Sequence, residues 1–219
     1  MTARPLPVIG GAAAQRHLAR DPLLAPVLAE VGRCQLRPEK REPYEALVRA
    51  IAHQQVHGRA AAAILGRLIA AFPGHDFPPD TAILGAQPET IRACGLSGAK
   101  VAAIRDIAEK SVAGLVPTRR AAARLSDAEL IERLTAIRGV GRWTVEMLLI
   151  FTLGRPDVLP VDDFGVREGY RLAAGLDQQP RPRDLAAIGE AWAPYRSVAA
   201  WYLWRRADAA KLIRPAHEA

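Results

Sequence analysis

The sequence predicts an all-α protein made of two helical lobes with a cleft between them. The chain has 219 residues, of which 50% are hydrophobic, and this is enough to bury one good-sized core or two smaller ones. Alanine, leucine and arginine dominate segments of roughly ten to twenty residues, which proline and glycine separate. These segments do not alternate between apolar and polar residues as β-strands do.

The positions of proline and glycine divide the chain into its helices. Breaks are expected at Pro73-Gly74, Pro78-Pro79, Gly95, Gly154 and 180–182. The helices between them are expected at about 11–20, 22–32, 43–57, 58–72, 80–86, 88–94, 97–113, 127–137, 142–153, 164–174, 183–193 and 195–207. We assign about 43–153 to one lobe and about 1–42 plus 154–219 to the other.

Two of these helices, 127–137 and 142–153, are joined by a short glycine hairpin. Ser126 and Glu129 have capping-box spacing at the start of the first helix. Gly139 and Gly141 flank Val140, so the backbone can adopt positive φ values and approach a partner closely. The second helix then begins with free N–H groups and the positive end of its dipole, which suit a phosphate oxygen. An ordinary helix–helix turn with a glycine C-cap would have the same pattern.

Charge and cysteine content narrow the functional class. The net charge is +7 and the pI is about 10.0, which favours a phosphate-rich partner over a neutral metabolite. Only Cys34 and Cys94 are present, so the sequence offers no ligand set for zinc or an iron–sulfur cluster. The cysteine content favours a reducing cytoplasm, and no segment is apolar enough to indicate a membrane or a signal peptide.

Two glutamines and two histidines interrupt the apolar run that begins at Leu47. His53 and His57 are four residues apart, but a third metal ligand is lacking nearby. Gln54 and Gln55 could form a polar helix end that faces solvent. Alternatively, this tip could touch DNA, with a glutamine hydrogen-bonding to base edges or filling the gap that an extruded nucleotide leaves.

Aromatic residues are scarce but cluster near the hairpin and the C-terminus. Trp192 and Trp201 are expected to pack in the core. Trp143 opens the second helix of the hairpin, where its ring could stack on a flipped base. Trp204 and Tyr202 lie close together near the C-terminus and are further candidates for such a pocket.

Two adjacent acids, Asp162 and Asp163, precede the predicted helix 164–174. One of them is expected to be the N-cap. A pair of carboxylates could also bind Mg²⁺, but a third acid in a matching pattern is lacking. A single carboxylate near a sugar could instead stabilise the positive charge that develops at C1′ when a base departs.

Together these segments resemble the helix-hairpin-helix superfamily of DNA glycosylases, and most closely its 3-methyladenine DNA glycosylase II branch, from about Tyr44 to Trp204. The matching segments are Ile51 to Val56, Cys94 to Lys100, Leu134 to Thr144, Leu159 to Arg167 and Trp192 to Trp204. The longer members have an N-terminal β-rich domain that has no counterpart here. His57 also replaces the small hydroxyl residue that is usual after Gln-Gln-Val.

The resemblance implies a role for each candidate residue. Asp163 matches the catalytic aspartate, Asp162 is structural, and Gln55 matches the wedge that enters the duplex. Trp143 and Trp204 match aromatic positions of the base pocket. The DNA contacts are assigned to Gln54, Gln55, Gly139, Val140, Gly141, Arg142 and Thr144. The backbone carbonyls of Ile137 and Val140 are candidates for holding a structural Na⁺ or K⁺ ion.

One position separates the branches of the superfamily. Members that also cut the strand have a lysine where this chain has Trp143, and that lysine forms a Schiff base with the sugar. We therefore expect base excision without strand cleavage. The resemblance as a whole implies a monofunctional enzyme that excises alkylated bases from double-stranded DNA in base excision repair, without a catalytic cofactor. We expect the protein to be a monomer. The alternatives are a non-catalytic DNA-binding module and a glycosylase/lyase that acts on oxidised bases.

Overall fold

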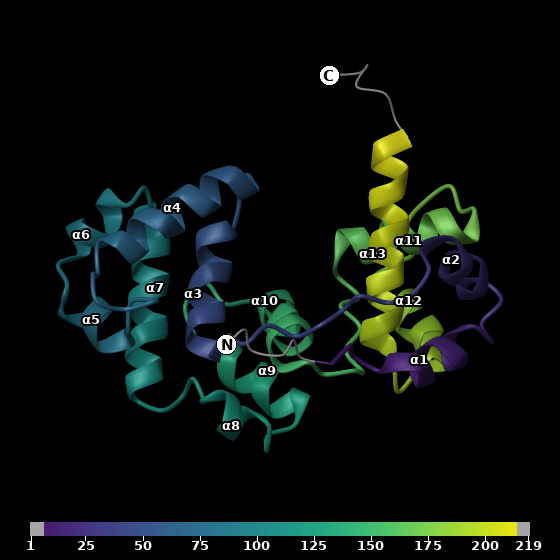
Figure 1. The fold of residues 1–219 in the computed structure, drawn as a ribbon, viewed down its shortest axis with the longest axis horizontal. Helices are drawn as coiled ribbons and strands as arrows, with labels where there is room; N and C mark the ends of the chain where they lie inside the picture. The colour runs from purple at the N-terminus through teal and green to yellow at the C-terminus, as the bar shows by residue number, and fades with distance from the viewer. Residues whose placement is uncertain (1–6, 214–219) are drawn as a thin grey trace. The chain divides into compact units, whose positions relative to one another are not determined.

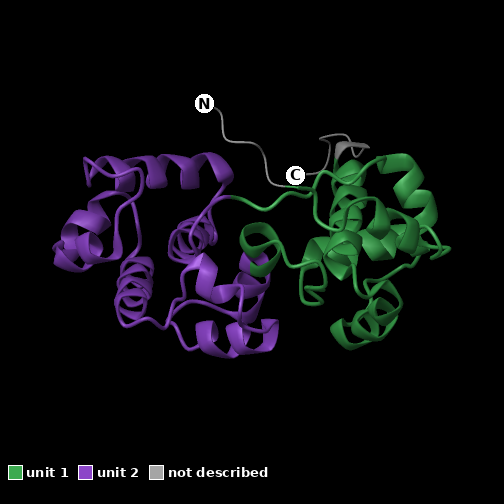
Figure 2. Cartoon of the chain, turned by 60° about the horizontal axis from the view of Figure 1, so that its bottom comes forward, with its two compact units in different colours: residues 1–39, 149–219 green, residues 40–148 purple. Residues whose placement is uncertain are grey.

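A computed structural model describes residues 7–213 of the chain. Over this range it contains helices and loops and no β-strand (Figure 1), which confirms the predicted all-α class. The chain divides into two compact units. One unit comprises residues 40–148, and the other comprises the residues up to 39 together with those from 149 onward (Figure 2).

The unit of residues 40–148 is built around one central helix. Its helices are α3 (Pro43–His53), α4 (Gly58–Ala70), α5 (Asp80–Gly85), α6 (Pro88–Ala93), α7 (Gly98–Val112), α8 (Arg119–Ala122), α9 (Asp127–Thr135) and α10 (Arg142–Met147). Helices α3, α5 and α6 pack against α7, and α9 packs against α10. The buried face of α7 includes Val101, Ile104 and Ile107, so the central helix supplies the apolar surface that its neighbours cover.

The second unit is organised around the long helix α13. Its elements are α1 (Gly11–Leu18), α2 (Leu24–Val31), all but the first residue of the π-helix η1 (Leu148–Leu153), α11 (Phe164–Ala174), α12 (Pro182–Gly189), the 3-10 turn η2 (Glu190–Trp192) and α13 (Arg196–Ile213). Helix α13 packs against α11 and α2. A Cβ atom at Gly169 of α11 would lie 1.9 Å from the backbone oxygen of Leu203 in α13, so glycine is required where these helices cross.

The helices differ from the predicted ones at five places. Helix α3 ends at His53 rather than at about residue 57, and the short helix α8 was not predicted. The predicted helix 142–153 is α-helical only to Met147 and continues as a π-helix. The predicted last helix, 195–207, extends to Ile213, and the α-helical part of 183–193 ends at Gly189. The other predicted helices are found within a few residues of their expected places.

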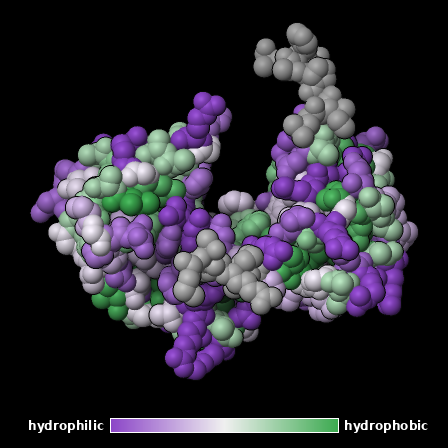
Figure 3. Space-filling model, viewed as in Figure 1, coloured by the Kyte–Doolittle hydropathy of each residue, from purple (hydrophilic) through white to green (hydrophobic). Residues whose placement is uncertain are grey.

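One face of the protein is largely polar. Figure 3 shows hydrophilic side chains over much of the visible face, interrupted by smaller apolar patches. Between residues 7 and 213, the helices are too short or too polar to cross a bilayer. Among the large apolar side chains of the described residues, Phe164 at the start of α11 is the most exposed at 66%.

Candidate functional site

The hairpin between α9 and α10 has the predicted capping box and a left-handed backbone at Gly139, but not at Gly141. Ser126 and Glu129 form a complete capping box at the start of α9, as the sequence predicted. Gly139 has a φ of 77°, and a Cβ atom there would lie 3.1 Å from the Ala103 Cβ of α7. Glycine at this position therefore allows both the left-handed backbone and the close packing of the hairpin on α7.

Gly141 has a different reason to be glycine. Its φ is −91°, which any residue can adopt, and a Cβ atom there would meet no atom within 4 Å. The protein itself therefore does not require glycine here. The missing side chain leaves the N-terminal turn of α10 uncovered, so a partner can approach its backbone N–H groups closely.

Two arginines flank the hairpin. Arg138 is exposed, and its backbone N–H donates to Asp106 Oδ2 of α7 at 2.8 Å. Arg142 donates from Nε to Glu146 Oε1 at 2.9 Å; its side chain is 62% exposed, whereas that of Glu146 is 2% exposed. The ion pair holds the Arg142 stem against α10 and leaves most of the side chain at the surface, where it could meet a phosphate.

The side chains of Val140 and Thr144 are buried. Little of either residue reaches the surface, whereas Gly139, Gly141 and Arg142 beside them are exposed.

The polar tip that follows α3 is a loop and not a helical turn. Gln54 is half-buried, and its Nε2 donates to the Gly139 oxygen of the hairpin at 3.1 Å. Gln55 is exposed and has a φ of 55°, which is uncommon for a residue other than glycine. Gln54 thus ties the loop to the hairpin, while Gln55 points its side chain to the surface.

A cavity of about 490 Å³ opens beside this loop. Trp143, which is 46% exposed, contributes the largest aromatic surface to it. The lining consists of Ala50, His53, Gln54, Gln55, Trp143, Thr144 and Met147. An exposed indole in a mostly apolar cavity is a surface on which a planar base can stack.

In the other unit, Asp163 is the N-cap of α11. Its Oδ1 accepts the backbone N–H of Val166 at 2.8 Å and the indole Nε1–H of Trp204 at 2.8 Å. The acid that caps the helix is therefore also the predicted catalytic acid. Asp162 is exposed to solvent. It does not cap α11, so capping is not the structural role predicted for it.

Trp204 is fixed on both sides. Its ring stacks on Phe151 of the π-helix, with 5.5 Å between ring centroids and 28° between ring planes. A Cβ atom at Gly165 would lie 2.8 Å from the Trp204 Cδ1 and 3.2 Å from the Asp163 Oδ1. Gly165 therefore allows the indole and the carboxylate to meet directly over the start of α11.

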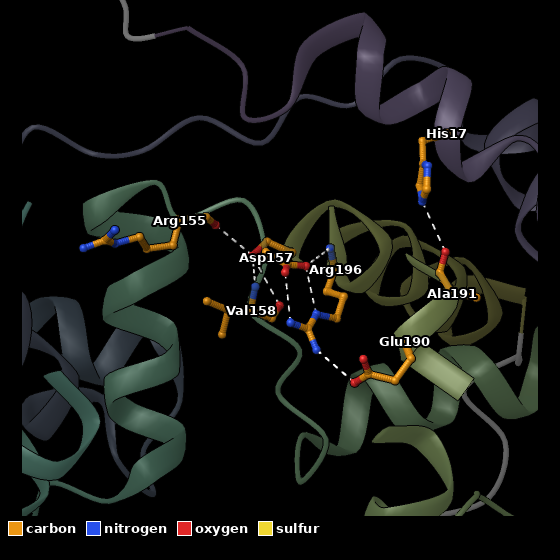
Figure 4. Close-up of polar contacts among 8 residues, drawn as sticks. His17, Arg155, Asp157, Val158, Glu190, Ala191 and Arg196 are labelled. Atoms are coloured by element: carbon orange, nitrogen blue, oxygen red, sulfur yellow. Dashed lines mark hydrogen bonds and ion pairs between the residues drawn. The ribbon is translucent and has the colours of Figure 1, made fainter. Parts of the chain in front are cut away.

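The segment that leads to Asp163 is held by the start of α13. Arg196 donates from Nε and Nη2 to the two oxygens of Asp157 at 2.8 and 2.9 Å, and Figure 4 shows this bidentate pair with Glu190 beside it. The hydrogen bond from Arg196 lowers the pKa of Asp157. The buried Ser197 hydroxyl donates to the Arg155 oxygen at 2.8 Å and accepts the Val158 N–H at 2.9 Å.

These features agree with the protein family that the chain matches. Residues 48–194 match the HhH-GPD superfamily of base excision DNA repair proteins. The chain belongs to this superfamily. The match begins in α3 and spans both the hairpin and Asp163, so it covers each of the regions described above.

Individual relatives within the HhH-GPD superfamily are also similar. DNA-3-methyladenine glycosylase 1 of Schizosaccharomyces pombe is 48% identical over 180 residues, which cover 81% of this chain and 79% of that protein. The alkylbase DNA glycosidase-like protein mag2 of the same organism is 34% identical over 195 residues, with 88% and 92% coverage.

Solved structures of HhH-GPD proteins have the same fold. The S. pombe 3-methyladenine DNA glycosylase Mag1 in complex with abasic DNA superposes with a TM-score of 0.80 at 45% identity, covering 89% of this chain and 96% of that one. A DNA-3-methyladenine glycosidase from Bacillus halodurans has a TM-score of 0.84 at 32% identity, with 96% and 95% coverage.

One predicted pocket residue of this HhH-GPD protein is placed elsewhere. Tyr202 is fully buried, and its hydroxyl donates to the Gly32 oxygen at 2.9 Å and accepts from Gln15 Nε2 at 3.0 Å. It is a satisfied core residue and not a pocket wall, which corrects the prediction. Trp192 and Trp201 are buried in the core, as the sequence predicted.

His53 and His57 lie at the two ends of the loop that follows α3. His53 lines the cavity beside Gln55, and His57 is the N-cap residue of α4. Within the described range, residues 7–213, His, Cys, Asp and Glu side chains form no cluster of three that could hold a metal ion. The two histidines are therefore polar residues at the edges of the loop.

Sequence reasoning missed Lys100 of α7. Its Nζ donates to the backbone oxygens of Ala52 at 3.0 Å and Gln54 at 2.6 Å, so it holds the C-terminal end of α3. Desolvation by its surroundings lowers the pKa of Lys100. The sequence did point to the segment from Cys94 to Lys100, which is one of those that resemble the family. It could not identify the oxygens of Ala52 and Gln54 as partners of Lys100, because these contacts depend on the packing of α7 against α3.

Proposed function

We propose that this protein is a monofunctional DNA glycosylase that excises alkylated bases from double-stranded DNA by hydrolysing the N-glycosidic bond. The observation that carries the proposal is the Asp163 carboxylate, oriented by Val166 and Trp204. It occurs in a chain that is 48% identical to a DNA-3-methyladenine glycosylase. An N-cap bond alone would suit a DNA-binding module equally well, so the 48% identity is needed to favour the enzyme.

The hairpin holds the DNA backbone in this proposal. The uncovered first turn of α10 after Gly141 presents backbone N–H groups to a phosphate, and Arg138 and Arg142 add positive charge on either side. These contacts do not read sequence. They suit a repair enzyme, because it must search DNA of any sequence for damage.

The loop after α3 opens the duplex. Gln55 enters the base stack and takes the place of the damaged nucleotide, which turns out of the helix. Trp143 offers its exposed ring face to a base. A base made cationic by methylation is attracted to such a π face, which favours alkylated over normal bases.

Asp163 serves the bond-breaking step. The bond between C1′ and the base nitrogen breaks, and its electron pair leaves with the base, which departs neutral because methylation had made it cationic. Positive charge develops on the sugar, where the Asp163 carboxylate stabilises it. A water molecule adds its oxygen to C1′ and loses a proton to solvent.

Strand cleavage is not part of the proposed activity. A lyase needs an amine that attacks C1′ and forms a Schiff base, and this chain has the indole of Trp143 at that position. Trapping with borohydride during the reaction is therefore expected to give no covalent protein–DNA adduct.

The hairpin is also a candidate site for a structural Na⁺ or K⁺ ion. The Ile137 oxygen accepts the Val140 N–H at 3.1 Å, which leaves the second lone pair of that carbonyl for another partner. The backbone oxygens of Ile137 and Val140 would hold the ion, which would supply positive charge close to the bound phosphate. Catalysis needs neither this ion nor an iron–sulfur cluster.

Asp163→Asn tests the proposal. Asparagine remains a good N-cap and can still accept both hydrogen bonds through its oxygen, so the fold should persist. We expect base release from duplex DNA containing 7-methylguanine to fall by about 100-fold or more, with duplex affinity unchanged. Asp162→Asn is the matched control, because it removes the same charge from the neighbouring exposed position and should keep full activity.

The outcomes separate the competing functions. Release of free base by the wild-type protein, lost only in Asp163→Asn, supports the glycosylase. Tight duplex binding without base release from any alkylated substrate would favour the binding module, and a borohydride-trapped adduct would favour a lyase.

A further inference from the structure

Helix α7 carries a cation that fixes the loop of the proposed wedge. Lys100 lies in the first turn of α7, and its Nζ donates to the oxygens of Ala52 and Gln54 at 3.0 and 2.6 Å. The last carbonyls of a helix lack partners within the helix, and a positive charge at this end is favourable. Lys100 therefore satisfies the end of α3 at the point where the chain turns toward Gln55.

The backbone of Gln55 needs such support. Its φ of 55° places a side chain with a Cβ in the left-handed region, which persists only where the surroundings hold it. The contact to Gln54 at 2.6 Å fixes the residue directly before it. By holding the Gln54 oxygen, Lys100 helps to set the direction in which the Gln55 side chain points.

The same helix also holds the hairpin. Asp106, two turns along α7 from Lys100, accepts the backbone N–H of Arg138 at 2.8 Å, and Ala103 lies against Gly139. Gln54 connects the loop directly to the hairpin, because its side chain donates to the Gly139 oxygen at 3.1 Å. One helix therefore sets the register between the loop of the wedge and the turn that faces the phosphate.

We propose that Lys100 is a positioning residue that fixes the Gln55 loop relative to the hairpin, so that opening of the duplex depends on it while phosphate binding does not. This inference rests on the proposed glycosylase function. Lys100 itself need not touch the substrate, because both of its acceptors are backbone oxygens of the protein.

Lys100→Met tests this role, since it keeps most of the side-chain length and removes the donor. Arg105→Met is the matched control. Arg105 also projects from α7 and donates to the oxygens at the end of another helix, α5, namely those of Ile83, Leu84 and Ala86. It makes the same kind of contact, but the helix end that it holds does not carry the wedge.

Three measurements are made on each variant: affinity for undamaged duplex, fluorescence of 2-aminopurine placed beside 7-methylguanine, and the single-turnover rate of base release. Lys100→Met should bind undamaged duplex like the wild type. Its fluorescence change should shrink, and its release rate should fall by about 10- to 100-fold, as expected for a misplaced group. The release rate of Arg105→Met should stay within about twofold of the wild-type rate. Lys100→Arg should be faster than Lys100→Met, because arginine keeps a cationic donor.

A double-mutant cycle with Gln55→Ala tests whether the effect passes through the wedge. If it does, Lys100→Met costs little further rate in the Gln55→Ala background. Equal rates for Lys100→Met and Arg105→Met, or fully additive losses in the cycle, would overturn the role of Lys100. A wild-type protein that releases no base would instead overturn the proposed function, and this inference with it. If Lys100→Met does not fold, the cycle is run with Lys100→Arg and judged by the same criterion.

Discussion

One oxygen atom of Asp163 joins the structure of the site to its proposed chemistry. Oδ1 accepts both the helix N–H of Val166 and the indole N–H of Trp204. An N-cap bond fixes the rotamer of the acid, and the indole bond fixes the position of the ring. The folding of α11 therefore orients the candidate catalytic group before any substrate arrives.

Trp204→Phe removes the N–H donor and keeps an aromatic ring to stack on Phe151. We expect the single-turnover rate of base release to fall by about 10-fold, because a hydrogen bond to a charged group contributes about 1.5–3 kcal/mol and only part of it acts in the transition state. Trp201→Phe is the control, since Trp201 is a core residue of the same helix. An equal loss of rate in the control would contradict the orienting role of Trp204.

Asp157→Asn is predicted to have an effect that depends on pH. Its bidentate bond from Arg196 lowers the pKa of the carboxyl below the ordinary value of 3.8. The carboxylate therefore stabilises the fold fully above that value, and this contribution disappears as the pH falls through the lowered pKa. At pH 7 the variant should lose about 1–2 kcal/mol of unfolding free energy.

Chemical denaturation at several pH values measures this difference. The gap between wild type and Asp157→Asn should be constant from pH 7 to about pH 5 and should narrow below pH 3.8. A gap that stays constant down to the lowest pH would show that the charge of Asp157 contributes nothing.

At single residues, the sequence indicated which chemistry a side chain could perform. It did not indicate which residues that side chain would contact in the fold. The pattern around Asp163 and the Gly139 turn indicated their local structures, because capping and left-handed turns depend on neighbours in the chain. The bond from Gln54 to Gly139 spans 85 positions, and the partners of Lys100 and Tyr202 are also far away in the sequence. Such contacts depend on packing and could not be read from local patterns.

At the scale of elements, the crossing of α11 and α13 depends on two glycines one turn apart. Gly165 leaves room for Trp204, and Gly169 leaves room for the Leu203 backbone. Backbone atoms cannot move aside as a flexible side chain does, so the contact at Gly169 is the stricter of the two. The approach of α13 to α11 thus places Trp204 over the start of α11.

Gly169→Ala should destabilise the protein by about 1–3 kcal/mol or more, as overpacking does. Gly66→Ala is the matched control: Gly66 lies inside α4, where a Cβ atom would meet nothing within 4 Å. That substitution should stabilise the protein by about 0.5–1 kcal/mol through helix propensity. Thermal unfolding of both variants provides the measurement, and a stabilised Gly169→Ala would contradict the packing argument.

Most helices could be predicted because apolar periodicity and proline or glycine breaks act locally. The π-helix at Leu148–Leu153 could not, since its sequence, Leu-Leu-Ile-Phe-Thr-Leu, suits an α-helix equally well. The four-residue helix α8 is too short for a periodic signal. Where helix α3 ends, the oxygens of Ala52 and Gln54 accept from Lys100, which lies in another element and could not be paired with them from the sequence.

At the scale of the whole molecule, the net charge of +7 favours nucleic acid in general, whereas the hairpin gives the charge a place to act. These two contributions can be separated. A uniform excess of charge predicts that any surface cation contributes equally to DNA binding. Local recognition predicts that a cation beside the hairpin contributes more than one elsewhere.

Arg138→Ala and Arg183→Ala lower the net charge by the same amount, but Arg138 lies in the hairpin and Arg183 lies on α12 in the other unit. Plots of log affinity against log salt concentration for a short undamaged duplex compare them. Losing one phosphate contact should reduce the slope by about one, so Arg138→Ala should flatten the plot and Arg183→Ala should leave it parallel to that of the wild type. Equal slopes for the two variants would mean that overall charge, and not the hairpin, governs the encounter with DNA.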